Sequence, residues 1–343
     1  YVIFDGRPGG SGSNRELTFT NSGNGPTILL IDDASNNTIR YCNVVGSANT
    51  SATSGVILFS TTANTTGNDN NTIDNSDINA LGSAVGICAS GTTGKENDNN
   101  TISNNRIRNF YISNTSPTST YGIRLTTASN NFSVTGNSLY QETARAYSAT
   151  AYIHYGISAT NTNSVNGFVI SGNYIGGSAP LCAGSAYTHS SGGSSRFYAI
   201  EISTGTTNPT SVQGNTIQNF DISSGYTSGA TTLFGGMVVT AGQVNIGTVT
   251  GNTIGAASAN SITISLTGAA AGPIISGIAF TSGTPHQVLN NTIAGITVNA
   301  TTATAYGHLW AISLGSASSV ITVTGNTIGT AAAPINNNSG SGG

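Results

Sequence analysis

Carboxylates are the first residues to consider for chemistry, because the chain has only 12 Asp and Glu residues among 343. Asp69 and Asp98 stand in turns of the same sequence, Asn-Asp-Asn-Asn, within neighbouring repeats of the chain. Carboxylate and amide oxygens are ligands that Ca²⁺ prefers in proteins. If the two turns stack, Asp69 and Asp98 form a candidate metal site for calcium; a solvated turn is the alternative interpretation.

The other acidic residues with a definite place in the repeats match basic residues one to one. Stacking would set Asp74 beside Arg40 and Asp77 beside Arg106, as opposite charges commonly pair across strands on a surface. Such pairing leaves no cluster of unpaired acids, and no Ser-His-Asp arrangement, phosphate-binding loop or dinucleotide fingerprint stands out. We therefore predict no catalytic residue, no enzymatic activity and no cofactor, apart from the candidate calcium ion.

Aromatic and histidine side chains gather in the variable segments between repeats. Their spacing contains no metal-binding motif. Aligned along one edge, these rings could stack sugar rings and form a ligand edge; the alternative is that they pack the insertions onto the scaffold. The residues concerned are Tyr152, His154, Tyr155, Tyr187, His189, Tyr198, Tyr306, His308 and Trp310.

An internal repeat positions all of these residues. Its clearest form is the heptapeptide Val-Thr-Gly-Asn-Thr-Ile-Gly, at residues 323–329 and again at 249–255. Looser copies begin at an aliphatic anchor, with Gly or Asn at the second residue after it, usually Asn at the third, and an aliphatic residue at the fifth. The anchors are Ile39, Ile73, Ile102, Val134, Ile170, Val212, Val249, Val288 and Val323.

The repeat predicts the architecture of a stacked solenoid. Alternate aliphatic residues would face one core, and Gly or Asn at the second position would take a left-handed turn. Asn at the third position would stack into a hydrogen-bonded column. The predicted structural Asn column is Asn105, Asn137, Asn173, Asn215, Asn252, Asn291 and Asn326.

A second strand pattern precedes each anchor from Ile73 onward and reads Gly or Ala, aliphatic, any residue, apolar, as in Gly122-Ile123-Arg124-Leu125. Variable insertions enter ahead of it, so they belong to one corner of each coil. We predict an all-β parallel β-helix of about ten coils with almost no helix. Residues 1–343 would form a single β-helix, with incomplete first coils in 1–31, repeated coils in 32–330, and the start of a further insertion or a flexible tail in 331–343.

The composition excludes several classes of partner. The net charge is −3, charged residues make up 6 %, and Lys95 is the single lysine, so there is no basic stripe for nucleic acid. No apolar run is long enough to insert into a membrane. The three cysteines, Cys42, Cys88 and Cys182, are too few for a disulfide framework and are predicted to be buried. A bridge between Cys42 and Cys88 has no positive support.

The repeat resembles that of right-handed parallel β-helices of the pectate-lyase-like, periplasmic copper-maturation and alginate-epimerase-like kinds. Gly122–Leu125 followed by Asn130–Leu139 carries this resemblance best. The opening, Phe4–Gly10 and then Arg15–Thr18, is similar to β-helix regions of large secreted surface proteins exported by the type IX system of Bacteroidota. The first resemblance implies a right-handed β-helix, and the second implies a stalk or adhesin.

These observations lead to expectations about function. The first is a non-catalytic structural or adhesive rod segment of an extracellular, cell-surface or filament-forming protein. Because no polar cap is recognisable at either end, it would associate end to end or continue a longer chain. The alternative is a polysaccharide-binding or polysaccharide-processing β-helix, of the lyase or epimerase kind, whose partners are surface glycans. Binding to ice or crystal surfaces through Thr columns is a third option, which the irregular insertions disfavour.

Overall fold

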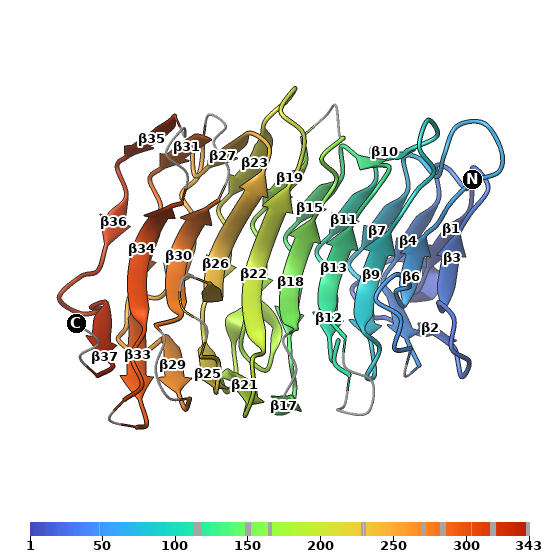
Figure 1. Ribbon diagram of the computed structural model, residues 1–343. Coiled ribbons are helices and arrows are strands. Elements are labelled where there is room, and N and C mark those ends of the chain that lie inside the picture. Colours follow the sequence, from blue (N-terminus) through green and yellow to red (C-terminus); the bar gives the residue numbers. More distant parts are fainter. Residues whose placement is uncertain are drawn as a thin grey trace.

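The chain forms a parallel β-helix in the computed structural model (Figure 1). The structure describes residues 1–47, 49–112, 118–147, 152–163, 167–227, 229, 231–268, 272–281, 286–302, 304–315 and 320–340. Within them the helical elements are two short 3₁₀ turns, η1 (Pro8–Gly10) and η2 (Pro180–Cys182). No helix in this described part is long and apolar enough to cross a membrane.

Three long parallel sheets form the faces of the coil, and successive strands of the chain visit them in turn. Sheet A contains β1 (Ile3–Asp5), β4 (Thr38–Arg40), β7 (Thr72–Asp74), β11 (Thr101–Ser103), β15 (Ser133–Thr135), β19 (Val169–Ser171), β23 (Thr210–Gln213), β27 (Val244–Ile246), β31 (His286–Leu289) and β35 (Ile321–Thr324). Sheet B contains β2 (Leu17–Thr20), β5 (Cys42–Val45), β8 (Asp77–Asn79), β12 (Arg106–Arg108), β16 (Ser138–Tyr140), β20 (Tyr174–Ile175), β24 (Thr216–Ile217), β28 (Thr253–Gly255), β32 (Thr292–Ala294) and β36 (Thr327–Ile328). Sheet C contains β3 (Ile28–Leu30), β6 (Ile57–Phe59), β9 (Val85–Ala89), β13 (Tyr121–Leu125), β18 (Ile153–Ala159), β22 (Arg196–Ser203), β26 (Thr232–Ala241), β30 (Ile274–Phe280) and β34 (His308–Leu314).

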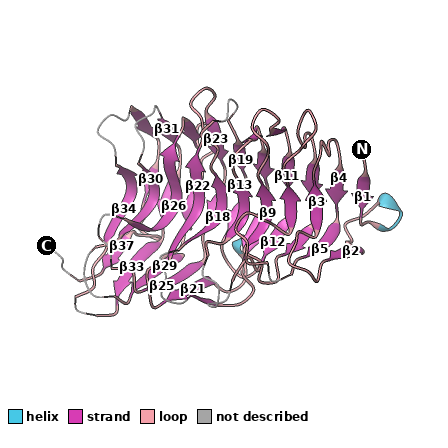
Figure 2. Cartoon of the chain, turned by 45° about the vertical axis from the view of Figure 1, so that its right-hand side comes forward, coloured by secondary structure: helices cyan, strands magenta, loops and turns pink. Residues whose placement is uncertain are grey.

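The insertions enter between sheets B and C, at the predicted corner. From β17 onward they form a fourth parallel sheet, called the insertion sheet here, which lies along one edge of the solenoid (Figures 1 and 2). Its strands are β17 (Arg145–Tyr147), β21 (Tyr187–Ser191), β25 (Phe220–Ser224), β29 (Ile262–Leu266), β33 (Ile296–Ala300) and β37 (Asn336–Asn338). A short pair, β10 (Asn97–Asp98) and β14 (Ser129–Asn130), lies at another corner. The described parts of the insertions from β17 onward are therefore a regular element of the fold.

The predicted ends of the solenoid differ from the structure in one respect. Residues 1–31 supply one strand to each of sheets A, B and C, so they form a first coil rather than incomplete ones. In the segment 331–343, β37 extends the insertion sheet by pairing with β33. Residues 341–343 lie outside the described residues.

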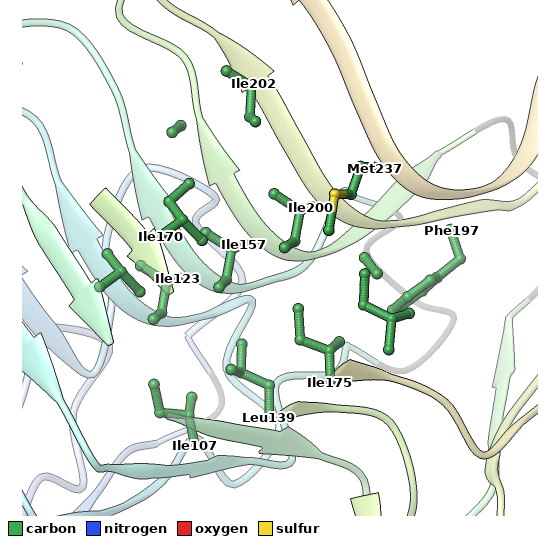
Figure 3. Close-up of a cluster of buried hydrophobic side chains, with 14 of the residues drawn as sticks. Ile107, Ile123, Leu139, Ile157, Ile170, Ile175, Phe197, Ile200, Ile202 and Met237 are labelled. Carbon is green, nitrogen blue, oxygen red and sulfur yellow. The ribbon is translucent and has the colours of Figure 1, made fainter. Parts of the chain in front are cut away.

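Inward-facing aliphatic side chains from all three faces fill the core (Figure 3). Ile107 and Leu139 come from sheet B, Ile123 from sheet C and Ile170 from sheet A, and none of the four is exposed. Parallel pairing stacks like on like, with Ile102 paired to Val134 in sheet A and Ile107 paired to Leu139 in sheet B. The alternating pattern therefore becomes continuous apolar columns, and burial of such area is the main favourable term in folding.

The small residue that opens each sheet C pattern has a packing cause. A Cβ atom built on Gly236 would stand 2.6 Å from the carbonyl oxygen of Gly277 in the next coil and 2.8 Å from Ile254 across the core. Both distances are far below van der Waals contact. Sheet C approaches sheet B too closely here for a large side chain, which explains why Gly or Ala occupies this column.

One predicted anchor is wrong. In sheet A, Ile246 pairs with Val212 and with Val288, whereas Val249 lies in the following turn and is 85 % exposed. Gly325 takes the expected left-handed conformation at φ +69°, but Gly251 in the identical heptapeptide has no such φ. The longer turn at 247–251 accommodates the difference, and the two copies converge again at their Asn.

Candidate functional site

The most regular polar feature is a buried ladder of asparagine side chains at the turn between sheets A and B. The backbone N–H of each Asn except the last, Asn326, donates to Oδ1 of the Asn in the following coil, at 2.9–3.0 Å. Its side-chain Nδ2 donates to the same oxygen at 2.8–3.0 Å. Its members are the seven predicted residues, Asn105, Asn137, Asn173, Asn215, Asn252, Asn291 and Asn326.

The same amides also reach backward along the solenoid. Nδ2 of Asn215 donates at 2.9 Å to the carbonyl oxygen of Ile170, the anchor residue of the preceding coil. Each amide therefore joins the coils before and after its own. Ser76 and Cys42 continue the column toward the N-terminus, since Cys42 N–H donates to Ser76 Oγ at 3.2 Å and Ser76 N–H donates to Asn105 Oδ1 at 2.9 Å.

Two shorter Asn ladders run beside β10, and sequence reasoning missed them. Asn68 donates to Asn97 at 2.9 Å, and Asn71 donates to Asn100 at 3.1 Å, both through the side-chain amide to Oδ1. Asn71 and Asn100 stand two residues before their anchors, so the repeated spacing Asn-x-Ile was the signal that could have revealed them. Later coils carry Phe132 and Phe168 at this position, and the polar column becomes aromatic.

The charged pairs form in the predicted register but with different partners. Asp74 lies beside Arg40 in adjacent strands, yet it accepts from Ser103 Oγ at 2.7 Å. Asp77 lies beside Arg106 in register, but its ion pair is with Arg108 at 2.9 Å. The long guanidinium of Arg108 reaches Asp77 from two residues along the neighbouring strand, so backbone register alone did not determine the pairing.

The structure brings the candidate calcium residues together. Asp69 Oδ1 accepts from the backbone N–H of Asp98 at 2.8 Å. Burial raises the pKa of Asp98, and the neighbouring charge of Asp69 raises it further. Burial also raises the pKa of Asp69, and the hydrogen bond from Asp98 N–H opposes this effect only in part. Among the described residues, no group of three or more His, Cys, Asp or Glu side chains could hold a metal ion. A melting temperature that changes with neither calcium nor EDTA would rule out a calcium site at Asp69 and Asp98.

The predicted aromatic edge is not one exposed surface. His154, Tyr187 and His189 are buried, because the insertion sheet folds against the coil and encloses them. His154 Nδ1 lies 2.8 Å from Thr120 Oγ1, and His189 Nε2 lies 3.0 Å from Ser195 Oγ. Burial lowers the pKa of both imidazoles, to about 3 for His189. These rings pack the insertion onto the coil, which was the alternative interpretation.

The remaining aromatic residues divide into two groups. Tyr155 and Tyr198 lie almost buried on the outer face of sheet C, where Tyr155 stacks on Tyr121 at a centroid distance of 4.7 Å. Tyr152, Tyr306, His308 and Trp310 retain exposed surface, and Trp310 is 41 % exposed on β34 at the C-terminal end. Only this last group offers rings to a ligand.

Glu201 is a carboxylate that sequence reasoning did not select. It lies on the outer face of sheet C, next to Ser158 in register, and accepts from Ser158 Oγ at 2.7 Å. Burial raises its pKa, against the lowering effect of that hydrogen bond and of Arg124 and Arg196. A carboxyl group with a raised pKa is one that can serve as a general acid.

One groove and the three cysteines complete the survey of the described residues. A groove of roughly 320 Å³ beside β24 and β28 is lined by Cys182, Gln218, Asn219, Ala256, Ser258, Ala259, Asn260 and Ser261, and so offers amides and hydroxyls without a carboxylate or an aromatic ring. Cys42, Cys88 and Cys182 are buried and free, so no bridge joins Cys42 to Cys88. Burial raises the pKa of Cys88 and of Cys182 to about 12, which suppresses thiolate reactivity.

No family model, curated protein or solved structure matches the chain. Its function is therefore inferred from the geometry just described.

Proposed function

We propose that the chain is a non-catalytic structural or adhesive rod segment of an extracellular protein, located at the cell surface or in a filament. The observation that supports this best is the asparagine ladder. Each of its interior rungs ties together three successive coils, and the rungs run without interruption from Asn105 to Asn326. A solenoid held in this way is a stiff element of fixed rise, which suits a spacer or stalk.

The axial partners of the rod are a second part of this proposal. Val2, Ile3 and Phe4 expose at least 41 % of their surface at one end, and Leu314 and Ile328 expose more than half of theirs at the other. Unpaired strand edges with apolar side chains favour the addition of further strands. The rod would associate end to end or continue a longer chain, and we propose an extracellular location on the basis of its sequence resemblance to exported stalks and adhesins.

Electron micrographs of the native particle that contains this segment provide the test. A straight rod or filament with uniform cross-section is the expected result, and antibody against the segment should label the surface of intact cells. A globular particle without a rod, or labelling only after cell lysis, would refute the proposal.

A second candidate function, glycan binding or processing, rests on Trp310, His308 and Glu201. His308 and Trp310 are exposed on one strand with ring centroids 6.0 Å apart, which suits stacking on a sugar. The test is a panel of uronate and neutral glycans, assayed for binding and for cleavage. Trp310→Ala should abolish binding and Glu201→Gln should abolish cleavage, whereas Val249→Ala, at an exposed turn, should change neither. Absence of binding and cleavage across the panel rejects this function.

A further inference from the structure

A groove interrupts the corner between sheet B and the insertion sheet, and differences in turn length create it. Only Gln218 and Asn219 join β24 to β25. In the coil before, residues 176–186 join β20 to β21, and in the coil after, residues 256–261 join β28 to β29. Because β21, β25 and β29 are neighbours in the insertion sheet, the short turn lies between two longer ones (Figure 2). The groove of roughly 320 Å³ described above has the short turn as its floor and the longer turns as its walls.

Asn219 supplies a fixed acceptor in the floor of the groove. Its side-chain Nδ2 donates to the carbonyl oxygens of Cys182, Gly184 and Ser185 at 3.0, 3.1 and 3.2 Å. These three carbonyl oxygens determine the orientation of the amide, because none of them could donate to Oδ1. Oδ1 of Asn219 receives no hydrogen bond from the described residues, so it remains available to a ligand that donates.

Asn260 supplies a fixed donor in one wall. Thr297 Oγ1 donates at 2.7 Å to Oδ1 of Asn260, and Nδ2 of Asn260 has no acceptor among the described residues. The side chains of Gln218 and Ser258 also line the groove and make no hydrogen bond within the described part of the chain. The groove therefore presents both donors and acceptors, and bonds to the surrounding protein hold two of them in place.

The absence of charge decides which ligands this arrangement favours. No charged side chain is among the described residues that line the groove. An anion would find no cation there and would face the oxygen of Asn219, and a metal ion would find no carboxylate. A hydroxyl group both donates and accepts, so it can bond to Asn219 Oδ1 and to Asn260 Nδ2. The volume lies at the lower end of the range of about 300–1,000 Å³ that small-molecule sites occupy.

We propose that this groove is a binding site for a neutral sugar. Asn219 Oδ1 accepts from a sugar hydroxyl, and Asn260 Nδ2 and the Gln218 amide donate to others. Because the groove has no aromatic ring to stack on the sugar, a modest dissociation constant of about 1 mM is expected. The inference goes beyond the role of a rod, and it requires neither Glu201 nor the exposed ring of Trp310.

Solution NMR of the full chain with methyl glycosides tests the site. The neutral probes are the methyl glycosides of glucose, galactose, mannose and N-acetylglucosamine, and the charged counterpart is the methyl glycoside of glucuronate. At least one neutral probe should shift the side-chain amide signals of Gln218 and Asn260, with a dissociation constant of about 1 mM. The glucuronate should bind at least about fivefold more weakly, because its carboxylate finds no cation in the groove.

Two isosteric variants locate the binding. Asn260→Asp keeps the oxygen that accepts from Thr297 but replaces the donor Nδ2, and Gln218→Met removes both polar atoms of the amide. Each should weaken binding of the neutral glycoside about fivefold or more. Asn245→Asp, on β27 of sheet A, is the matched control and should leave binding unchanged, as should Trp310→Ala.

Circular dichroism shows whether each variant folds, and the shifts in the wild-type chain decide the question for a variant that does not. Three results would each overturn the assignment: no shift of the Gln218 and Asn260 signals with any neutral glycoside, equal binding of the glucuronate, or unchanged binding by a folded groove variant. Loss of binding in Trp310→Ala would overturn it as well, since the sugar would then lie on the exposed rings. None of these outcomes bears on whether the native particle is a rod.

Discussion

Replacing one interior rung of the asparagine ladder should cost far more than replacing its terminal rung. Asn215→Leu removes the acceptor of Asn173 N–H at 3.0 Å and of Asn173 Nδ2 at 2.9 Å, and the donor to Ile170 O at 2.9 Å. Three buried hydrogen bonds are then lost, although Asn173 Nδ2 keeps its second bond, to the carbonyl oxygen of Val134. At about 1–3 kcal/mol for each group that loses a partner, the gross cost is roughly 3–9 kcal/mol, offset in part by the added apolar burial of Leu.

The same substitution at the open end provides the matched control. Asn326→Leu also removes the partner of Asn291 N–H, but this site is only partly buried and water can replace the lost hydrogen bonds. We expect a loss of about 1 kcal/mol or less there, because the groups left without partners can bond to water. The large difference between the two sites comes from burial, since the hydrogen-bonding pattern is otherwise the same.

Denaturant unfolding followed by circular dichroism measures the two losses. Long repeat arrays can unfold in stages, so hydrogen exchange at the amides of Ile170 and Asn173 should accompany it. Asn215→Leu should accelerate exchange there, and Asn326→Leu should not. Equal losses of stability for the two variants would show that the ladder is an incidental consequence of turn formation and does not hold the coils together.

Three further predictions concern buried groups elsewhere. Burial lowers the pKa of His189 from 6.5 to about 3, so the stabilising contribution of the neutral imidazole is fully present above pH 6.5. Between pH 6.5 and 3 the free energy of unfolding should fall by about 1.4 kcal/mol per pH unit. In an acid titration, His189→Phe should give a shallower fall. Gly236→Val should lower the melting temperature by well over 10 °C or prevent folding, whereas Gly192→Ala, with open space around its Cβ, should leave it nearly unchanged. Asp98→Asn should raise the melting temperature at pH 7, because the raised pKa of Asp98 means that folding disfavours its charged form; calorimetry showing a lower value would contradict this.

The coil and its ladder could be predicted because they depend on local and periodic properties. Alternation fixes which side chains point inward, and the left-handed turn before the ladder favours Gly or Asn, as at Asn104 (φ +55°) and Gly136 (φ +66°). Parallel stacking then repeats each choice in the next coil. A column of identical residues in sequence thus becomes a column in space without further information.

The insertions could not be predicted in the same way, since their order depends on contacts with one another. Nothing in the spacing of Tyr187 and His189 reveals that a strand of the next insertion pairs with theirs and closes over them. The heptapeptide at 249–255 shows the same limit on a smaller scale. Its letters equal those at 323–329, but the anchor position in sheet A is taken by Ile246 upstream, and Val249 is left in solvent.

The insertion sheet begins only at Arg145, and this gives the solenoid a mechanical polarity. Coils before that point are held by the central core, whereas in later coils the insertion sheet widens this core with such residues as Phe220, Ile264 and Val298. In a stacked array each coil resists opening through its own contacts and those of its neighbours. Under tension applied along the chain, the coils before Arg145 should therefore unfold first. The coils backed by the insertion sheet should stay folded while the others extend.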